Sequence, residues 1–332
     1  MRKPAHLRDR MKKLISALLG LWVLAGHDLV EAQKVYRIGS LVATDQFIPA
    51  FNGFKKKMAE LGYVEGRNIT YEFHNANGER DALKAMAEKL VRDKHDVIVT
   101  SSTTATAPVA RASAGTNVPV VFLSAGNPLE FIKSYASSGN NITGISSSSL
   151  DLIDKRMELL KELTPGIKRV IALQVPSGTN YEEVRRLTLK AAKKLGLALV
   201  EVEPSGYEEL KSKISGFVTR KLGDAVFLPP DAAVIVVVEE IAQQAIKERL
   251  PVVGPNIENV KRGVLAAYSS DYFALGQQGA VLVDKILKGA RPTDLPIEQP
   301  YKLKLALNLK TAKAIGLKIP REILLRANEV TE

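Results

Sequence analysis

Five consecutive hydroxyl residues occupy positions 100–104, directly after the β-branched run 97–99 and before a stretch of helical composition. Read as strand–turn–helix, this order places hydroxyls and the free N–H groups of a helix start together at the carboxyl end of a buried strand. Ligands bind at that edge of open α/β sheets. The alternative is that Ser101 or Thr103 merely caps the next helix. The run predicts a ligand-facing rim made of Thr100, Ser101, Ser102, Thr103 and Thr104.

Other polar or aromatic residues follow predicted strands in the same way, and each has a structural alternative. Phe47 could belong to the core of the following helix, and Tyr181 could either stack on a planar ligand or pack at a helix start. Asp231 and Asp271 could each be an acidic ligand contact or a helix cap. The further candidates for the site are Ser40, Thr44, Phe47, Ser124, Asn127, Ser177, Thr179, Asn180, Tyr181, Asp231 and Asp271.

Strand and helix patterns that alternate along the chain are expected to position these residues. Predicted strands of a first series lie at 36–42, 69–73, 96–100, 118–123 and 141–145, and those of a second series at 169–175, 198–202, 224–228, 251–253 and 264–268. A helix at 272–287, a connector rich in proline at 291–300 and a last strand at 302–307 follow. The run 232–238 suits either a strand or a helix, and we expect a helix because Asp231 can cap it. Two successive βαβ series predict an α/β fold of two doubly wound, Rossmann-like lobes.

Composition and the N-terminus restrict the class of protein. The chain has 332 residues, a formal net charge of +11 and no cysteine. Six basic residues precede the apolar run 14–25, and Val30-Glu31-Ala32 resembles a cleavage site, so residues 1–32 are expected to be a secretory signal peptide. Either Met1 or Met11 could be the start. Without the cysteine of a lipoprotein, the mature chain is expected in the periplasm, and its spread positive charge does not predict nucleic-acid binding.

Catalytic and metal-binding signals are weak. His74 and His95 are the only histidines after residue 32, and His95 precedes its strand, at the end away from the predicted rim. The sequence contains no phosphate loop and no GxGxxG, GxSxG or HExxH motif. We therefore expect no enzymatic activity, no cofactor and no metal. A secreted α/β hydrolase remains the less favoured alternative.

Several longer segments resemble one family of transport proteins. Residues 60–69 (ELGYVEGRNI), 139–146 (GNNITGIS), 283–296 (VDKILKGARPTDLP) and 308–320 (NLKTAKAIGLKIP) resemble the ABC transporter substrate-binding proteins of the tryptophan/tyrosine type. The resemblance covers essentially the whole mature chain. It implies the type I periplasmic-binding-protein fold, with a three-crossing hinge between one lobe of residues 33–145 plus 270–295 and another of 146–269 plus 296–332.

The resemblance also implies capture of a small solute in the cleft and its delivery to an ABC permease of the inner membrane, by a protein we expect to be monomeric. A module that presents its ligand to a membrane sensor is the alternative. For an amino-acid ligand, residues 100–104 are the predicted carboxylate site. Asn127 replaces an aspartate frequent in the family, so this chain offers a neutral oxygen where relatives offer a charge. The ligand of the relatives therefore need not carry over.

Overall fold

The computed structural model describes residues 34–178 and 180–332. The predicted signal peptide and Thr179 lie outside the described residues. Residues 36–332 form one compact unit, and the account below concerns that unit. Among the described residues, no helix combines the length and the hydropathy needed to cross a membrane.

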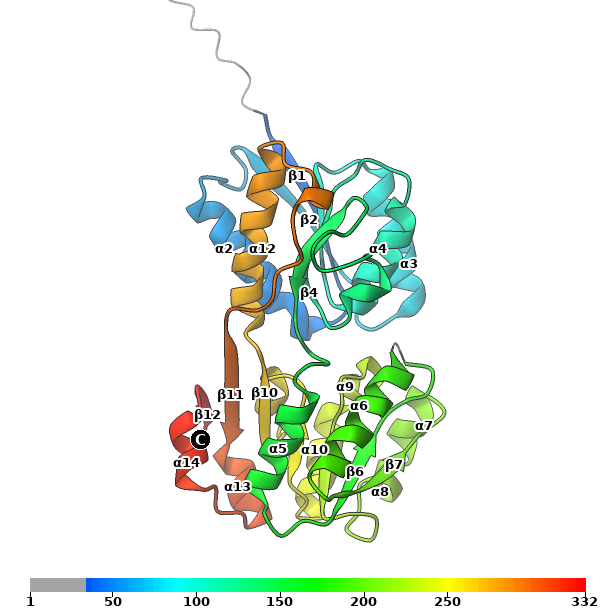
Figure 1. Ribbon diagram of the computed structural model, residues 1–332, viewed down its shortest axis with the longest axis vertical. Helices are drawn as coiled ribbons and strands as arrows, with labels where there is room; N and C mark the ends of the chain where they lie inside the picture. The colour runs from blue at the N-terminus through cyan, green and yellow to red at the C-terminus, as the bar shows by residue number, and fades with distance from the viewer. Residues whose placement is uncertain (1–33, 179) are drawn as a thin grey trace, which may run out of the picture. The chain divides into compact units, whose positions relative to one another are not determined.

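The first sheet has five parallel strands in the order β2-β1-β3-β4-β5 (Figure 1). The strands are near-continuous apolar runs such as Val97-Ile98-Val99, which is typical of strands buried on both faces. They are β1 (Tyr36–Val42), β2 (Ile69–Asn75), β3 (Val97–Ser101), β4 (Val120–Ala125) and β5 (Ile142–Ser146). The elements between them are η1 (Asp45–Phe47), α2 (Ile48–Glu60), α3 (Arg80–Arg92), α4 (Thr103–Ser113) and η2 (Pro128–Glu130).

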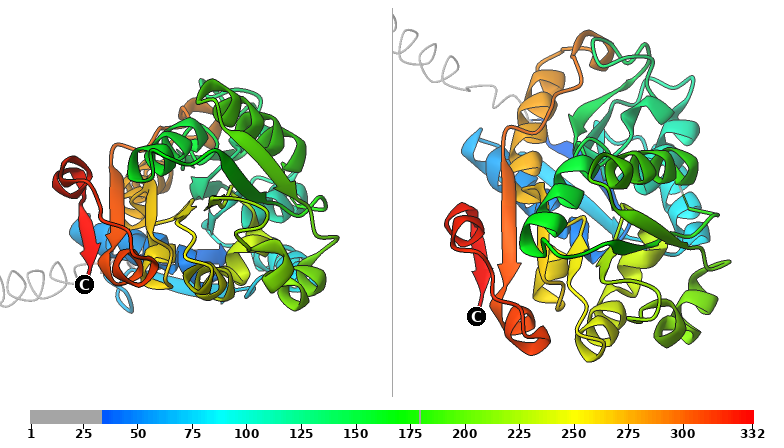
Figure 2. Two further views of the ribbon diagram at one scale, coloured as in Figure 1. Left: turned by 90° about the horizontal axis from the view of Figure 1, so that it is seen from below. Right: turned by 60° about the horizontal axis from the view of Figure 1, so that its bottom comes forward.

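The second sheet has seven strands in the order β12-β11-β10-β9-β8-β6-β7. All its pairs are parallel except β10 with β11, which lie side by side as yellow and orange strands in Figure 2. The strands are β6 (Arg169–Leu173), β7 (Ala198–Val202), β8 (Ala225–Phe227), β9 (Val252–Gly254), β10 (Ala266–Ser270), β11 (Leu303–Asn308) and β12 (Glu329–Thr331). Its helices are α5 (Ile153–Leu163), α6 (Tyr181–Lys194), α7 (Tyr207–Ser212), α8 (Ile214–Phe217), α9 (Ala232–Val236), α10 (Val238–Lys247), α11 (Glu258–Lys261), α13 (Leu309–Ile315) and α14 (Arg321–Arg326).

Hydrophobic clusters lie on both faces of each sheet. In the first sheet, Phe54 of α2 belongs to one cluster and Leu90 of α3 to another. In the second, Met157 of α5 and Ile241 of α10 likewise belong to separate clusters. The predicted α/β fold of two doubly wound halves is confirmed, because each sheet is covered on both sides.

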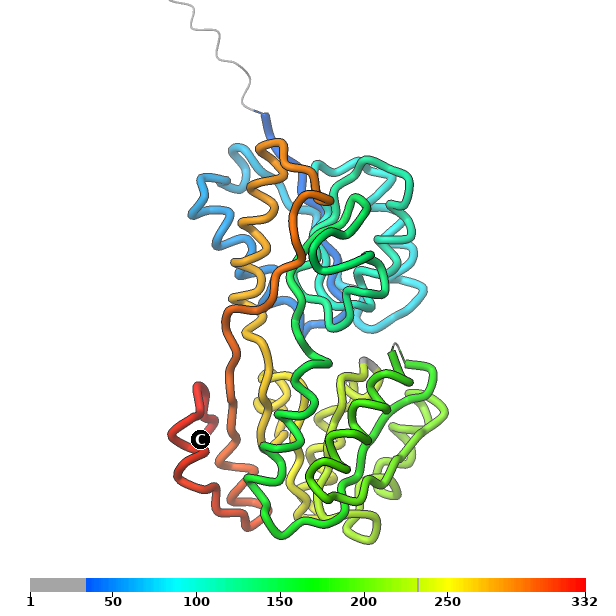
Figure 3. Tube along the Cα trace, in the orientation of Figure 1, coloured from blue at the N-terminus to red at the C-terminus, as the bar shows by residue number. Residues whose placement is uncertain are grey.

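The chain passes between the two sheets three times (Figure 3). It leaves the first sheet after β5 and enters α5, returns between β10 and α12 (Tyr272–Leu287), and crosses again between η3 (Pro292–Asp294) and β11. Helix α12 packs against α2 at two glycines. An added Cβ at Gly276 would lie 1.8 Å from the Ala50 carbonyl oxygen, and one at Gly53 would lie 1.9 Å from the Phe273 oxygen. These close approaches hold α12 against the first sheet.

Several details differ from the sequence expectations. The sequence of residues 207–217 predicts one helix, which the structure breaks at Lys213 into α7 and α8. Strand β10 begins two residues later than expected, because the Val264 N–H donates to the Asn259 carbonyl in the turn after α11. Helix α14 and strand β12 were not predicted, since six-residue and three-residue elements carry little periodicity. The expected helix after Asp231 is present, but it is broken at Val237 into α9 and α10.

Candidate functional site

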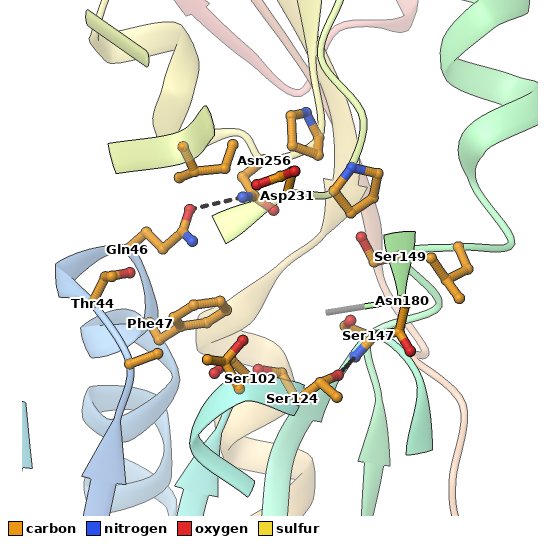
Figure 4. A pocket seen from close by; sticks show the side chains of 18 of the residues that line it. Thr44, Gln46, Phe47, Ser102, Ser124, Ser147, Ser149, Asn180, Asp231 and Asn256 are labelled. Carbon is orange, nitrogen blue, oxygen red and sulfur yellow. Dashed lines mark hydrogen bonds between the residues drawn. The ribbon is translucent and has the colours of Figure 1, made fainter. Parts of the chain in front are cut away.

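One cavity, of about 110 Å³, lies where loops of both sheets meet (Figure 4). Eight predicted site residues line it: Thr44, Phe47, Ser102, Thr103, Thr104, Ser124, Asn180 and Asp231. The first-sheet residues follow β1 and β3 or, for Ser124, lie near the end of β4, as expected for the carboxyl edge of a parallel sheet. The volume is below the roughly 300–1,000 Å³ common for ligand pockets, so it suits a small solute rather than a peptide or an oligosaccharide.

The hydroxyl run divides between the pocket and the interior beneath it. Residues 102–104 line the pocket, whereas the hydroxyls of Thr100 and Thr106 bond each other at 2.8 Å in the core. Ser101 is fully buried and does not line the pocket. The helix cap is Ser102, rather than Ser101 or Thr103, because its Oγ accepts the Ala105 N–H at 3.0 Å.

Ser102 has a φ of +89°, which is uncommon for a residue with a side chain and marks local strain. The neighbouring Thr103 Oγ1 accepts the N–H groups of Gly126 and Asn127 at 3.0 and 3.1 Å. These contacts fix the turn after β3 against the turn after β4. The strained turn is thus held rigidly at the pocket wall.

The predicted site residues in β1 and in the turn after it have different environments. The hydroxyls of Ser40 and Thr44 are buried without a hydrogen-bond partner among the described residues, but only Thr44 lines the pocket. An unpaired hydroxyl on a pocket wall is a position that a polar ligand atom can satisfy. Phe47 is the last residue of η1 rather than part of α2, and its ring packs at 5.2 Å from that of Tyr272.

Two side-chain amide pairs connect the loops of the two sheets. Asn127 Nδ2 donates to Asn180 Oδ1 at 2.7 Å, so this amide group contacts protein, and Asn127 itself does not line the pocket. Asn256 Nδ2 donates to Gln46 Oε1 at 2.7 Å, as the dashed line in Figure 4 shows. The Tyr272 hydroxyl donates to Asn256 Oδ1 at 2.7 Å. Gln46, Asn256 and Tyr272 all line the pocket.

Asp231 is buried on the pocket wall. Its Oδ2 accepts the Val175 N–H at 2.7 Å, and its Oδ1 accepts the Ala233 and Val234 N–H groups, so it caps α9. Burial raises the pKa of its carboxyl group, although these backbone hydrogen bonds oppose the rise. No lysine, arginine or histidine of the described residues lines this pocket.

Asp271, the other acidic candidate, lies outside the pocket lining. It caps α12 by accepting the Ala274 N–H, and its carboxylate lies 3.1 Å from Lys304 Nζ and 3.5 Å from Lys302 Nζ. Burial alone would raise its pKa, but the hydrogen bonds from Lys304 and Ala274 and the lysine charges lower it. These contacts are those of a helix cap, which is the alternative interpretation of Asp271.

Two predicted residues of the turn after β6 also lie outside the lining, and Thr179 is not described. Ser177 is exposed, and its carbonyl accepts a hydrogen bond from Arg80 Nη2 at 3.0 Å. The Tyr181 hydroxyl is bonded to Glu203, which raises the pKa of Tyr181 to about 12. Its contacts therefore favour the alternative that Tyr181 packs at the start of α6.

Sequence reasoning missed several lining residues. Ser147 and Ser149 follow β5, so the rule used for residues 100–104 would have found them. Gln46 and Asn256 follow β1 and β9 by the same rule. The sequence does not indicate Tyr272 as a site residue, because its pattern predicts only that Tyr272 begins a helix. The lining residues outside the prediction are Ala43, Gln46, Gly126, Ser147, Ser149, Leu150, Val184, Pro230, Ile235, Pro255, Asn256 and Tyr272.

The histidines lie away from this pocket. His95 is buried, with one ring nitrogen 3.0 Å from the Leu90 carbonyl and the other 3.0 Å from a Glu72 carboxylate oxygen. His74 contacts the other oxygen of Glu72. Among the described residues, no group of three or more His, Cys, Asp or Glu side chains could hold a metal ion.

Comparisons with known proteins agree with this geometry. A family described as ABC transporter substrate binding protein matches residues 37–331. The tyrosine-binding protein of Clostridioides difficile (strain R20291) is 29% identical over 289 residues, which are 86% of this chain and 81% of that protein.

Two solved structures are each 25% identical and cover 90% of this chain. A domain from Streptococcus pneumonia in complex with L-Trp is covered over its full length, with a TM-score of 0.81. The ligand-free, open structure of CD0873 from Clostridium difficile is covered over 99% of its length, with a TM-score of 0.68. The fold is that of the type I periplasmic binding proteins. With its family matched over nearly the whole described chain, this protein belongs to the ABC transporter substrate-binding proteins.

Proposed function

We propose that this protein captures a small amino acid with an aromatic or other apolar side chain in the pocket between its two sheets. It then delivers the ligand, chemically unchanged, to an ABC permease of the inner membrane. The proposal places the mature chain in the periplasm as a monomer, after removal of residues 1–32, without a nucleic-acid partner or a cofactor.

The observation that carries the proposal is the buried carboxylate of Asp231 on a pocket wall without a basic side chain. A buried negative charge is stabilised by a positively charged group in contact with it, and an ammonium group supplies that charge. Phe47 and Tyr272 provide aromatic surface in the same pocket. Serine and threonine hydroxyls provide hydrogen-bond donors for a carboxylate.

The relatives support the same ligand class. One is named a tyrosine-binding protein, and another was solved with L-Trp. At equal identity and coverage, the TM-score is higher with the L-Trp complex than with the ligand-free, open structure. The amide pairs Asn127–Asn180 and Gln46–Asn256 also connect the two sides of the pocket. These observations support a closed conformation.

Closure would occur about the three crossings. We assign residues 33–145 and 270–295 to one lobe and 146–269 and 296–332 to the other, because α12 packs on α2 while β10 pairs with β11. Shifting such an equilibrium from 1:99 to 99:1 requires about 5.5 kcal/mol of differential binding. Micromolar affinity corresponds to about 8 kcal/mol, which is sufficient.

The test is titration calorimetry on mature protein that has been unfolded and refolded to remove any bound solute. L-tyrosine, L-tryptophan, L-phenylalanine and L-leucine are the ligands, with D-galactose as the control. We expect micromolar or tighter binding of at least one amino acid and a smaller radius of gyration by X-ray scattering. Because the only tryptophan of the chain is Trp22, indole emission from freshly purified mature protein reports co-purified tryptophan.

Failure to bind any of these amino acids would refute the proposed ligand class. Conversion of the bound compound, seen by mass spectrometry, would refute delivery without chemistry. Uptake by membrane vesicles that contain the cognate permease separates the importer from a sensor module, since only the importer moves solute across the membrane.

A further inference from the structure

Arg156 is a buried cation in the second turn of α5. Its side chain is 1% exposed. Its Nε donates to the Tyr268 carbonyl oxygen at 2.7 Å, and its Nη1 donates to the Ser149 carbonyl oxygen at 2.8 Å. Burial lowers the pKa of the guanidinium to about 10, so the group remains charged at neutral pH.

The charge has no carboxylate partner among residues 34–178 and 180–332. Other arginines of the second half are ion-paired, for example Arg169 with Asp224 and Arg326 with Glu162. A buried ion without a counter-ion is strongly unfavourable unless another charge compensates it. Two carbonyl oxygens supply dipoles, but they supply no net negative charge.

Arg156 stands directly behind the pocket wall. Ser149, whose carbonyl it binds, and the adjacent Leu150 both line the pocket. Tyr272, another lining residue, is close enough for the charge of Arg156 to act on its phenol. The guanidinium thus contacts the backbone of a pocket-lining residue without lining the pocket itself.

The same wall carries unused hydrogen-bond donors. Within the described part of the chain, neither the Ser149 N–H nor the Leu150 N–H has a hydrogen-bond partner. In a trans peptide the C=O and the N–H point in opposite directions. Because the Ser149 carbonyl is turned toward Arg156, the Leu150 N–H of the same peptide is turned away from the guanidinium, and Leu150 lines the pocket. Ser148 precedes these groups with a φ of +49°, and left-handed residues of this kind help successive N–H groups converge on an anion.

We propose that Arg156 is a positioning residue for the ligand's carboxylate, which binds to the Ser149 and Leu150 N–H groups in front of it. The bound carboxylate is the counter-ion that the guanidinium lacks. Asp231 offers the opposite charge on the same pocket, so a zwitterionic amino acid is held in one orientation. This inference rests on the proposed function and adds to it: the ligand must have a free α-carboxylate, and amines or amides of the same side chain are rejected.

The test compares ligands with and without the carboxylate on variants of the mature chain. The probes are L-tyrosine, L-tyrosinamide and tyramine, each with the corresponding tryptophan compound, measured by calorimetry. R156M should weaken L-tyrosine binding by about 10- to 100-fold, because it removes the positive charge behind the Ser149 peptide; we scale this loss to that of one hydrogen bond to a charged group. The affinities for tyrosinamide and tyramine should change by less than about 3-fold, because these ligands present no negative charge to Arg156.

Two further variants separate charge from folding. R156K keeps the charge and should keep a clear preference for tyrosine over tyrosinamide, although it loses one of the two carbonyl contacts. R326M removes the same charge from an exposed ion pair and should leave all three affinities unchanged. Thermal melting of each variant reports its folding. If R156M does not fold, the preference measured for R156K decides the matter.

A loss of affinity in R156M that is equal for tyrosine and tyrosinamide would show a purely structural role and overturn the proposal. Loss of the tyrosine preference in folded R156K would also overturn it. If wild-type protein binds none of the amino acids, the proposed function fails. If wild-type protein binds them but the variants show no dependence on the carboxylate, only the role of Arg156 fails.

Discussion

Asp231 in the pocket and Asp271 at the hinge have the same local structure and opposite electrostatics. Each follows a strand of the second sheet, each caps a helix, and each is 6% exposed. Asp271 lies close to Lys304 of β11 and to Lys302, which precedes that strand. The hydrogen bonds from Lys304 and from the Ala274 N–H, together with the two lysine charges, lower the pKa of Asp271. Asp231 is bonded only to backbone N–H groups, and burial raises its pKa.

The difference separates an acid with a structural role from one that we propose contacts the ligand. Both residues cap a helix, so capping does not distinguish their roles. The deciding feature is whether the protein supplies the compensating cation. At the hinge Lys304 does so, from a strand more than thirty positions further along the chain. No described lysine, arginine or histidine lines the pocket at Asp231, where we propose that the ligand supplies the cation.

Replacing the pocket acid should have the largest effect on binding. Asp231→Asn removes the charge but retains one acceptor for the α9 cap. Loss of a charged hydrogen bond corresponds to about 1.5–3 kcal/mol, so we expect roughly 10- to 150-fold weaker binding of an amino acid by calorimetry. Asp271→Asn is the matched control and should stay within about 3-fold of wild type. Equal losses in the two variants would remove the distinction between the two acids.

Replacing the hinge cation should affect stability rather than binding. Lys304→Met leaves Asp271 buried with only the more exposed Lys302 nearby. Breaking a buried pair typically costs about 3–5 kcal/mol, and the partial exposure of Lys304 reduces our expectation to about 2 kcal/mol. Urea denaturation measures this loss, with Lys302→Met as the smaller-effect control. A ligand affinity that fell in parallel would contradict the separation of hinge from pocket.

The two acids should give opposite pH dependences of stability. Folding lowers the pKa of Asp271 from its ordinary value of 3.8. The stability that this carboxylate contributes is therefore present above pH 3.8 and is lost as the pH falls through its folded pKa. The pKa of Asp231 is raised, so its contribution is present below 3.8 and is lost as the pH rises through its folded pKa. The difference in unfolding free energy between wild type and each Asn variant, measured from pH 3 to 6, should therefore slope in opposite directions.

The amide pairs of the cleft should have the smallest effect. Asn127→Ala removes the hydrogen bond to Asn180, which corresponds to about 0.5–1.5 kcal/mol, or roughly 2- to 10-fold in ligand affinity. Gln46→Ala removes the second bridge, and the double variant should show the sum, since the two pairs share no residue. X-ray scattering should show the unliganded variants more open. No change in either measurement would mean that the bridges do not contribute to closure.

Much of the fold was predictable because the patterns are local. Apolar runs such as residues 97–99 predicted buried parallel strands, and the hydroxyls that follow placed Ser102 and Thr103 on the rim. Asp231 follows a predicted strand, and from this position the sequence allows either a helix cap or a ligand contact. These inferences need only neighbouring residues.

The remainder depends on contacts between distant parts of the chain. Nothing around Asp271 indicated that Lys304 would neutralise it, and nothing around Arg156 indicated that Tyr268, 112 positions later, would accept its Nε–H. The turn after β6 followed the same strand-end rule as the others, yet Tyr181 bonds Glu203 instead of lining the pocket. Strand-end position predicts the edge of the sheet but not the direction of the side chain.

The glycine contact between α2 and α12 also has a consequence for evolution. Gly53 and Gly276 let the two backbones touch, and α12 begins at Tyr272, whose ring and hydroxyl form part of the pocket wall. A methyl group added at position 276 would clash with the backbone of α2 and displace the first turn of α12. Drift in binding preference among descendants of this chain can thus begin at a site that never meets the solute.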